Sequence, residues 1–260
     1  MGLLTDQLIR TERHDAVAVV KINRPQVRNA LNLEALAALR ETLERVGRDR
    51  EVRCAVLAGE GGTFTTGDDL SETAHLDDAG IRKLIDGFQS LTVALRAMEQ
   101  PVIAAIEGYA VGGALEMAAA CDLRVCDEDT RFFCPETGLG LLLSNGSSAL
   151  LPRLIGAGRT RELMLTGRRF DAAWAERVGF VNRVFPRRQA LDGALEMARE
   201  VSAGQPAAVR TTKRLLNAAE DAEVEAALQL EVEATLEAYS DPAVMAGMRA
   251  QLERWAARKR

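Results

Sequence analysis

The chain has 260 residues, enough for one large domain with a buried interior. Its net charge of −5 argues against nucleic acid as a partner, because nucleic-acid binding needs a strongly basic face. No run approaches the roughly 20 apolar residues that span a bilayer, and Asp6 comes too early for a secretory signal. We therefore expect a cytoplasmic protein without a membrane partner.

Strand-like and helix-like segments alternate through the first two-thirds of the chain. Short β-branched or apolar runs predict strands, and apolar residues at helical spacing predict helices. Because the strands are separated by helices, the pattern indicates parallel β-α-β units. The predicted strands are residues 16–23, 52–58, 102–106, 123–127 and 131–134. The predicted helices are residues 32–48, 78–99 and 115–121, with a glycine- and threonine-rich loop at 59–67.

The last quarter of the chain has a different character. After Phe185-Pro186 the sequence is helical throughout, with Gly or Pro between the segments. Helices of this kind pack on the core, on a neighbouring subunit, or on both. The predicted helices are residues 190–201, 206–219, 222–239 and 242–257.

The segment 108–116 (GYAVGGALE) carries the strongest functional signal. Gly112 and Gly113 stand where a loop turns into a helix, and the first N–H groups of a helix have no partner within it. Glycine also lets a ligand approach the backbone closely. An N–H here is suited to hold a developing oxyanion, although a glycine needed only for close packing gives the same pattern.

Acidic residues near this junction are the candidates for proton transfer. Glu116 lies one helical turn after Gly113 among apolar neighbours, so we expect it to be buried or to face a pocket, with a raised pKa. Glu136 follows a predicted strand, where sites collect in parallel sheets, but an ordinary loop acid is the alternative. Asp68 and Asp69 are too few for a Ca²⁺ or Mg²⁺ site, and the functional alternative is that the backbone N–H of Asp68 binds a ligand.

Several other chemistries find no support in the sequence. The four cysteines (Cys54, Cys121, Cys126, Cys134) form no CxxC pair, and only two histidines could join them. A zinc site is therefore poorly supported, and we expect reduced, buried cysteines. The chain has no GxGxxG, no GxxxxGK[ST] and no serine in a G-x-S-x-G elbow.

Taken together, these motifs resemble the enoyl-CoA hydratase/isomerase (crotonase) superfamily over nearly the whole length. Residues 23–25 (NRP) with 29–32 (NALN) are similar to the opening signature of that family, and residues 64–70 (FTTGDDL) to its first oxyanion loop. Residues 101–110 (PVIAAIEGYA) with Gly112-Gly113 resemble the second oxyanion loop. Residues 161–167 (RELMLTG) and 179–182 (GFVN) match its downstream framework.

The resemblance implies an α/β fold: a crotonase-like spiral core of ββα turns, followed by a C-terminal helical trimerisation region. The core with the acyl-CoA site would span residues 1–200, and the oligomerisation region residues 201–260. The implied assembly is a homotrimer or homohexamer. No metal or separate cofactor is implied, because coenzyme A is part of the acyl-CoA substrate.

The resemblance also implies roles for individual residues. The backbone N–H groups of Asp68 and Gly113 would form the oxyanion hole, and Glu116 and Glu136 would be the catalytic acids that hold one water between them. The resemblance does not single out the cations for the CoA phosphates: Arg24, Arg28 and the tail at 258–260 are candidates by charge, and for the tail complementation of a helix dipole is the favoured alternative. The implied substrate contacts are Arg28, Ala30, Thr66, Gly67, Leu70 and Gly112.

The implied reaction is reversible addition of water to a 2-enoyl-CoA in fatty acid metabolism, which makes the protein a lyase. Alternatives are isomerisation, decarboxylation or thioester hydrolysis in the same pocket, or acyl-CoA binding without catalysis. One departure bears on the substrate. Where hydratases usually have a Pro-Gly-Ala-Gly-Gly-like run, this chain has residues 143–147 (LSNGS), whose polar side chains argue against a simple straight-chain enoyl group.

Overall fold

The structure is a computed structural model, and it describes the C-terminal part of the chain only in pieces. Half of the predicted helix at 222–239 lies outside the described residues, as do all of residues 1–7 and the basic tail at 258–260. The described residues are 8–220, 225–226, 228–229, 232–233, 235–236, 239–240 and 242–257.

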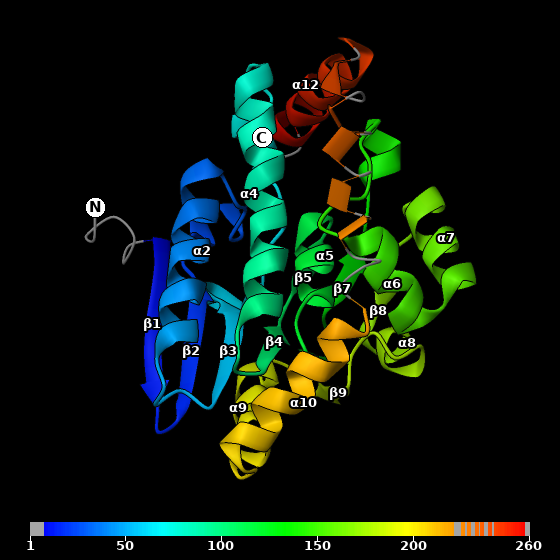
Figure 1. Cartoon of the computed structure of the whole chain (residues 1–260). Helices are drawn as coiled ribbons and strands as arrows, with labels where there is room; N and C mark the ends of the chain where they lie inside the picture. Colours follow the sequence, from blue (N-terminus) through cyan, green and yellow to red (C-terminus); the bar gives the residue numbers. More distant parts are fainter. Residues whose placement is uncertain are drawn as a thin grey trace.

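Six strands form the larger of two sheets, in the order β1-β2-β3-β4-β6-β9 (Figure 1). Every neighbouring pair is parallel except β1 and β2 at one edge. The parallel pairs agree with the predicted β-α-β units. The strands are β1 (Ile9–His14), β2 (Val17–Ile22), β3 (Cys54–Gly59), β4 (Val102–Ile106), β6 (Leu123–Asp127) and β9 (Arg183–Phe185).

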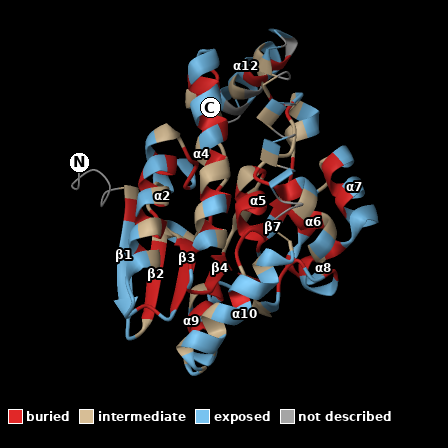
Figure 2. Ribbon diagram, viewed as in Figure 1, coloured by how far each residue is buried: buried red, intermediate tan, exposed pale blue. Residues whose placement is uncertain are grey.

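Both faces of this sheet are buried, because successive side chains of a strand point to opposite sides. Val19 and Val56, which are paired across β2 and β3, pack beneath α9 (Ala190–Ser202). Their neighbours Val20 and Leu57 belong to the larger core cluster on the other face. Figure 2 shows the result: β2 and β3 are buried, whereas the edge strand β1 is largely exposed.

Three helices cover the face of the sheet opposite α9, and their inward sides are buried (Figure 2). Two of them begin at side-chain caps that the sequence supplies. Asn32 accepts a hydrogen bond from Ala35 N at 2.9 Å, and Asp77 accepts one from Gly80 N at 2.8 Å. The helices are α2 (Leu33–Arg48), α4 (Asp78–Ala97) and α5 (Gly113–Ala119).

The chain alternates between the larger sheet and a smaller one, so that it winds as a spiral. After β4 it enters β5 (Tyr109–Val111) of the small sheet, and after β6 it enters β7 (Arg131–Phe133). The small sheet is completed by β8 (Phe170–Asp171), which is antiparallel to β7. Isolated bridges extend the pattern to earlier turns, since Leu31 pairs with Asp68 and Thr65 with Ala110.

Most of the predicted elements are confirmed, including the strands at 102–106 and 123–127 and the helix at 242–257 with unchanged bounds. The predicted loop at 59–67 contains a short 3-10 helix, η2 (Glu60–Gly62). Some elements were not predicted, because they are short or lie outside the apolar patterns. They are β1, β5, β8, β9, η1 (Pro25–Val27), α3 (Leu70–Thr73), η3 (Glu136–Leu139), α6 (Ser147–Ile155), α7 (Ala157–Thr166) and α8 (Ala172–Arg177).

A buried lysine fastens the C-terminal helices to the core. Lys213 lies on α10 (Pro206–Ala218), and its ammonium donates to Asp122 Oδ2 at 2.7 Å and to the carbonyls of Leu95 and Gln100 at 3.1 Å each. These three acceptors satisfy the three donors of the ammonium. At the other end of the molecule, α12 (Pro242–Ala257) packs near α3 and η3 (Figure 1).

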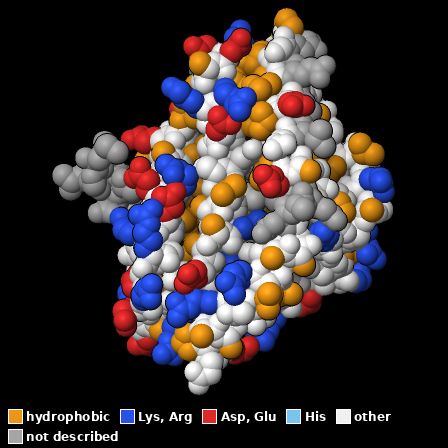
Figure 3. All heavy atoms as spheres, in the orientation of Figure 1, with side chains coloured by type: hydrophobic (Ala, Val, Ile, Leu, Met, Phe, Trp, Pro, Cys, Tyr) orange, Lys and Arg blue, Asp and Glu red, His pale blue; other side chains and the backbone are white. Residues whose placement is uncertain are grey.

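Acidic and basic side chains intermingle on the face drawn in Figure 3, over β1 and α2. Apolar side chains gather lower on the same face, over α10, where Leu215 and Leu216 are 64% and 65% exposed. Among the helices that the structure describes, none combines the length and the apolar character needed to cross a membrane.

We predict that Lys213→Met lowers the free energy of unfolding by about 3 kcal/mol, because it removes the cationic partner of a largely buried ion pair. Arg82→Met is the matched control. It breaks the Arg82–Asp86 pair, whose side chains are both 53% exposed, and should cost less than about 1 kcal/mol. Urea denaturation of both variants measures the difference. Equal losses would contradict the anchoring role of Lys213.

Candidate active site

Three successive turns of the spiral each bring one predicted site residue to the same edge of the small sheet. Asp68 comes shortly after Thr65, Gly113 lies two residues after the end of β5, and Glu136 comes shortly after β7. Thr65 is bridged in parallel to Ala110 of β5, and β5 is parallel to β7. Because the carboxyl ends of parallel neighbours meet at one edge, the three residues converge.

The two predicted oxyanion donors lie side by side. A Cβ placed on Gly67 would lie 3.3 Å from Gly113 N and 2.5 Å from the carbonyl oxygen of Val111, so only glycine lets the two loops approach this closely. Gly67 also has φ +76°, which favours glycine. Among the described residues, the N–H groups of Asp68 and Gly113 have no hydrogen-bond acceptor. Both are therefore free to bind a carbonyl oxygen.

The residues expected to contact the substrate surround these donors. Thr66 N donates to the Arg28 carbonyl at 3.2 Å, and Leu31 N donates to the Gly67 carbonyl at 2.7 Å, so the segment containing Arg28 and Ala30 lies along the first oxyanion loop. Leu70 begins α3 and packs in a small apolar cluster with Leu139, Leu141, Tyr239, Val244 and Met248.

Gly112 contacts both acids and directly precedes the second oxyanion donor. Its N–H donates to the Phe133 carbonyl at 3.0 Å, and its carbonyl accepts from Glu116 N at 3.1 Å. A Cβ on Gly112 would lie 2.1 Å from Glu136 Oε1. The carboxyl of Glu136 thus rests against the Cα of Gly112, and any side chain at this position would displace it.

Glu116 is 1% exposed, as its apolar neighbours predicted, and its carboxylate is fully hydrogen-bonded. Oε1 accepts from Ser144 N and Ser147 Oγ, each at 2.9 Å. Oε2 accepts from Ser144 Oγ at 2.9 Å and Asn145 Nδ2 at 3.2 Å. A carboxylate has about four lone-pair sites, so these donors fill them. From the sequence, Glu116 was expected to bind a water directly. In this structure the acceptor sites of its carboxylate are already occupied by these four donors.

The loop that supplies these donors is itself held in place. Thr92 Oγ1, on α4, donates to the Asn145 carbonyl at 2.9 Å. Asn145 adopts φ +61°, a conformation that asparagine tolerates better than most residues. Its amide also donates to the Gly113 carbonyl at 3.4 Å. The hydroxyls and the amide around Glu116 are thus fixed relative to the second oxyanion donor.

Glu136 has the opposite environment. Its Oε2 is buried and has no hydrogen-bond partner in the described part of the chain. Burial, and to a smaller extent the nearby charge of Asp68, raise the pKa of Glu136 to about 7. A carboxyl with this pKa can exchange a proton near neutral pH.

Two further groups of the site, the Asp68 carboxyl and the Tyr239 phenol, were not predicted from the sequence. Burial raises the pKa of the Asp68 carboxyl to about 7, while Thr73 Oγ1 donates to its Oδ1 at 2.6 Å. Only the backbone N–H of Asp68 was predicted to act at the site, but the charge of its side chain also acts on Glu136. The pKa of Tyr239 is raised by burial and by the charges of Asp68 and Glu136, which places its phenol near both acids.

The arginines considered for the CoA phosphates differ in availability. Arg24 is engaged, because its guanidinium pairs with Asp69 Oδ2 at 3.0 Å and also donates to the Ala30 carbonyl. Arg28 is exposed, and its guanidinium carbon lies 5.7 Å from the centre of the Tyr109 ring. Arg28 therefore remains the candidate within the described residues, while the tail at 258–260 lies outside them.

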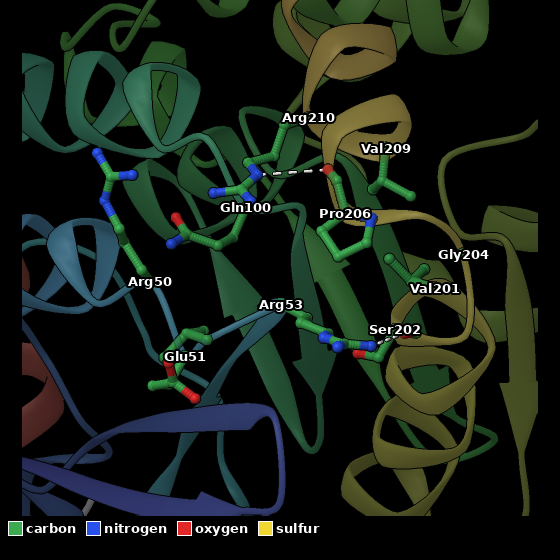
Figure 4. Close-up of a pocket in the computed structure, with 11 residues that line it drawn as sticks. Arg50, Glu51, Arg53, Gln100, Val201, Ser202, Gly204, Pro206, Val209 and Arg210 are labelled. Carbon is green, nitrogen blue, oxygen red and sulfur yellow. Dashed lines mark hydrogen bonds between the residues drawn. The ribbon is translucent and has the colours of Figure 1, made fainter.

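Two cavities lie away from the acids. One holds about 160 Å³ and is lined by the α2–β3 connection, the end of α9 and the start of α10 (Figure 4). Its arginines are partly engaged, since Arg210 Nε donates to the Pro206 carbonyl at 3.3 Å and Arg53 to the Ser202 carbonyl at 3.2 Å. The other holds about 690 Å³ between α2 and α4. None of the predicted site residues lines either cavity.

All four cysteines are buried and unbridged, as predicted. Burial raises the pKa of Cys134 well above its usual value, and the charges of Glu136 and Glu116 raise it further. Both glutamates are therefore close enough to act on the same thiol. Among the described residues, no group of three or more His, Cys, Asp or Glu side chains is arranged to hold a metal ion.

Known proteins resemble this chain over most of its length. The matching family model is described as enoyl-CoA hydratase/isomerase and spans residues 12–258. The short-chain-enoyl-CoA hydratase of Clostridium acetobutylicum is 35% identical over 230 residues, which are 88% of each chain. A crystal structure of enoyl-CoA hydratase/isomerase from Pseudoalteromonas atlantica T6c has a TM-score of 0.86 at 31% identity, covering 95% of this chain and 97% of that one.

A monofunctional enoyl CoA isomerase from M. smegmatis is 34% identical, with a TM-score of 0.70 over 83% of this chain and 94% of that one. Hydratases and an isomerase thus match at similar identity, and the spiral fold predicted from the sequence is confirmed. The chain belongs to the enoyl-CoA hydratase/isomerase (crotonase) family.

Proposed function

We propose that this protein is an enoyl-CoA hydratase, which adds water reversibly to a 2-enoyl-CoA thioester. The proposal is carried by two backbone N–H groups that have no acceptor within the described residues, beside two carboxyls of contrasting environment. Glu116 is surrounded by hydrogen-bond donors, whereas Glu136 is desolvated and has a pKa near 7. Such a pair suits a reaction that takes one proton and delivers another.

The N–H groups of Asp68 and Gly113 bind the thioester carbonyl oxygen in this mechanism. When water adds to C3, electrons move from the C2–C3 double bond to that oxygen, and an enolate develops. Hydrogen bonds aimed at the developing charge stabilise it more than the ground state, and one such donor contributes about 2.7–4 kcal/mol. Their fixed position, set by Gly67 and Gly112, means that little reorganisation accompanies the reaction.

The two glutamates divide the proton transfers. Glu136, protonated near neutral pH, gives its proton to C2 of the enolate. Glu116 is held as an anion by four donors and is the final acceptor of the proton that the attacking water loses. The groups at hand supply each step without a metal or a separate cofactor, and CoA enters as part of the substrate.

The expected assembly and location stay part of the proposal. Leu215 and Leu216 are exposed on α10, and a pair of apolar side chains on the C-terminal helices supports contact with another subunit in a homotrimer or homohexamer. We place the protein in the cytoplasm, where acyl-CoA thioesters are its small-molecule partners.

A second candidate is the isomerisation of a 3-enoyl-CoA to a 2-enoyl-CoA. One observation favours it. Of the two glutamates, Glu136 is the one with a buried carboxyl oxygen that has no partner in the part of the chain that the structure describes, and isomerisation needs a single group that moves a proton between two carbons. The choice of substrate distinguishes isomerisation from hydration. A hydratase removes the conjugated absorbance of 2-enoyl-CoA thioesters, whereas an isomerase creates it from 3-enoyl-CoA thioesters.

We expect Glu116→Gln and Glu136→Gln each to lower kcat for hydration by about 10²- to 10⁴-fold, because each substitution removes one general acid or base. The dissociation constant for the product 3-hydroxyacyl-CoA should change little, since the oxyanion donors remain. Loss of absorbance with a panel of short and branched 2-enoyl-CoA thioesters measures kcat. If both variants hydrate as fast as the parent, the protein does not use these acids for hydration.

The pH dependence should report Glu136. Hydration requires its protonated form, so kcat/KM for hydration should fall as pH rises through about 7. Asp68→Asn removes a negative charge that raises the pKa of Glu136 but keeps the backbone N–H, so this fall should move to lower pH. The measurement is kcat/KM from pH 5 to 9 for both proteins. If the fall in kcat/KM occurs at the same or at a higher pH in Asp68→Asn, the charge of Asp68 does not raise the pKa of Glu136.

A further inference from the structure

The hydrogen bonds around Glu116 raise a question for hydration, on which this inference rests. An attacking water must lose a proton, but four donors already occupy the carboxylate of the proposed acceptor. A water at Glu116 would have to displace one of them. The alternative is that one of the donors passes the proton on, and only a hydroxyl can both donate to the carboxylate and accept from water.

Two hydroxyls are bonded to Glu116, and they differ in exposure. Ser147 Oγ donates to Oε1 at 2.9 Å, but Ser147 is 0% exposed. Ser144 Oγ donates to Oε2 at the same distance, and Ser144 is only half-buried. The third side-chain donor, Asn145, is 0% exposed and is an amide rather than a hydroxyl. Of these three residues, Ser144 is therefore the one that keeps exposed surface where a water can approach.

The Ser144 hydroxyl also has free acceptor capacity. A hydroxyl has one proton and two lone pairs, and the proton of Ser144 is directed to Glu116. In the hydrogen-bond network around Glu116, Ser144 Oγ takes part as a donor and not as an acceptor. The backbone of Ser144 is fixed as well, because its N–H donates to Glu116 Oε1 at 2.9 Å and its carbonyl accepts from Ser147 N at 3.0 Å.

We propose that Ser144 is a catalytic residue that relays the proton of the attacking water to Glu116. As the water oxygen bonds to C3, its proton moves to Ser144 Oγ, and the proton of Ser144 moves to Glu116 Oε2. The electrons of the C2–C3 double bond go to the thioester oxygen, held by the N–H groups of Asp68 and Gly113. Glu136 then protonates C2, and the net change is the addition of one water.

The relay returns to its starting state by one further proton transfer. After product formation Glu116 carries a proton and Glu136 lacks one, so a proton must pass from the first to the second through solvent. The dehydration direction runs the same steps backwards, and Ser144 is a neutral hydroxyl before and after turnover in both directions. Ser144 is also part of the polar run at 143–147, the segment in which the sequence departs from the resemblance.

Ser144→Ala and Ser147→Ala form a matched pair, because each removes one hydroxyl that donates to Glu116 at 2.9 Å. We expect Ser144→Ala to lower kcat for hydration by at least about 100-fold, as loss of a proton-transfer group does. Ser147→Ala should lower it less than about tenfold, as loss of one supporting hydrogen bond does. KM should change little in either variant, and thermal unfolding shows that both are folded.

Ser144→Gly completes the test. Without the Cβ and hydroxyl of Ser144, a water can occupy the vacated space and contact Glu116 Oε2, so hydration should recover to at least about tenfold above Ser144→Ala. Equal losses in Ser144→Ala and Ser147→Ala, or no recovery in Ser144→Gly, would show that Ser144 only positions Glu116. If the parent hydrates no 2-enoyl-CoA, the proposed function fails and the relay with it. An active parent with an equally active Ser144→Ala rejects the relay alone.

Discussion

The close approach of backbone and side chains at Gly112 is the constraint on which the site depends. Its N–H is bonded to β7, its carbonyl to the first turn of α5, and its Cα faces Glu136 Oε1. A Cβ would lie 2.1 Å from that oxygen, and φ of +54° disfavours other residues. One glycine thus sets the position of an oxyanion donor and of both acids.

The two carboxyls show how environment gives identical groups different chemistry. Four donors stabilise the charged form of Glu116, because hydrogen bonds to a carboxylate favour ionisation. Glu136 has a buried oxygen that finds no partner among the described residues, and desolvation favours its neutral form. An unsatisfied buried polar atom lowers the stability of the folded state by about 1–3 kcal/mol. Here that loss of stability occurs at the carboxyl that has to release a proton.

Local patterns were enough to predict the elements with strong burial. The strand at Val102–Ile106 is buried on both faces and lies between Pro101 and Glu107, so its bounds could be read directly. The strand β1 was not predicted, because five of its six residues are exposed and its pattern is polar. β5, β8 and β9 have two or three residues each, too few to show a period.

The site was predictable in part for the same reason. Gly112, Gly113 and Glu116 are neighbours in the chain, and the apolar residues around Glu116 indicated its burial. Its partners were not predictable, because Ser144 and Ser147 come 28 and 31 residues later, and only the folded loop brings them back. The same holds for Tyr239, which approaches Asp68 and Glu136 from the far end of the chain.

The sequence of the loop at 143–147 determines which atom accepts the proton of the attacking water. A glycine at 144 would leave the carboxylate of Glu116 open toward the pocket, whereas serine covers Oε2 with a hydroxyl. The proton of the attacking water is then accepted by the neutral hydroxyl of Ser144, which is hydrogen-bonded to the Glu116 carboxylate, and not by the carboxylate itself. Since a neutral hydroxyl accepts a proton only while it releases its own, attack by water becomes tied to the hydrogen bond between Ser144 and Glu116. The chemistry of this site therefore depends on a contact between two residues that lie on different turns of the spiral.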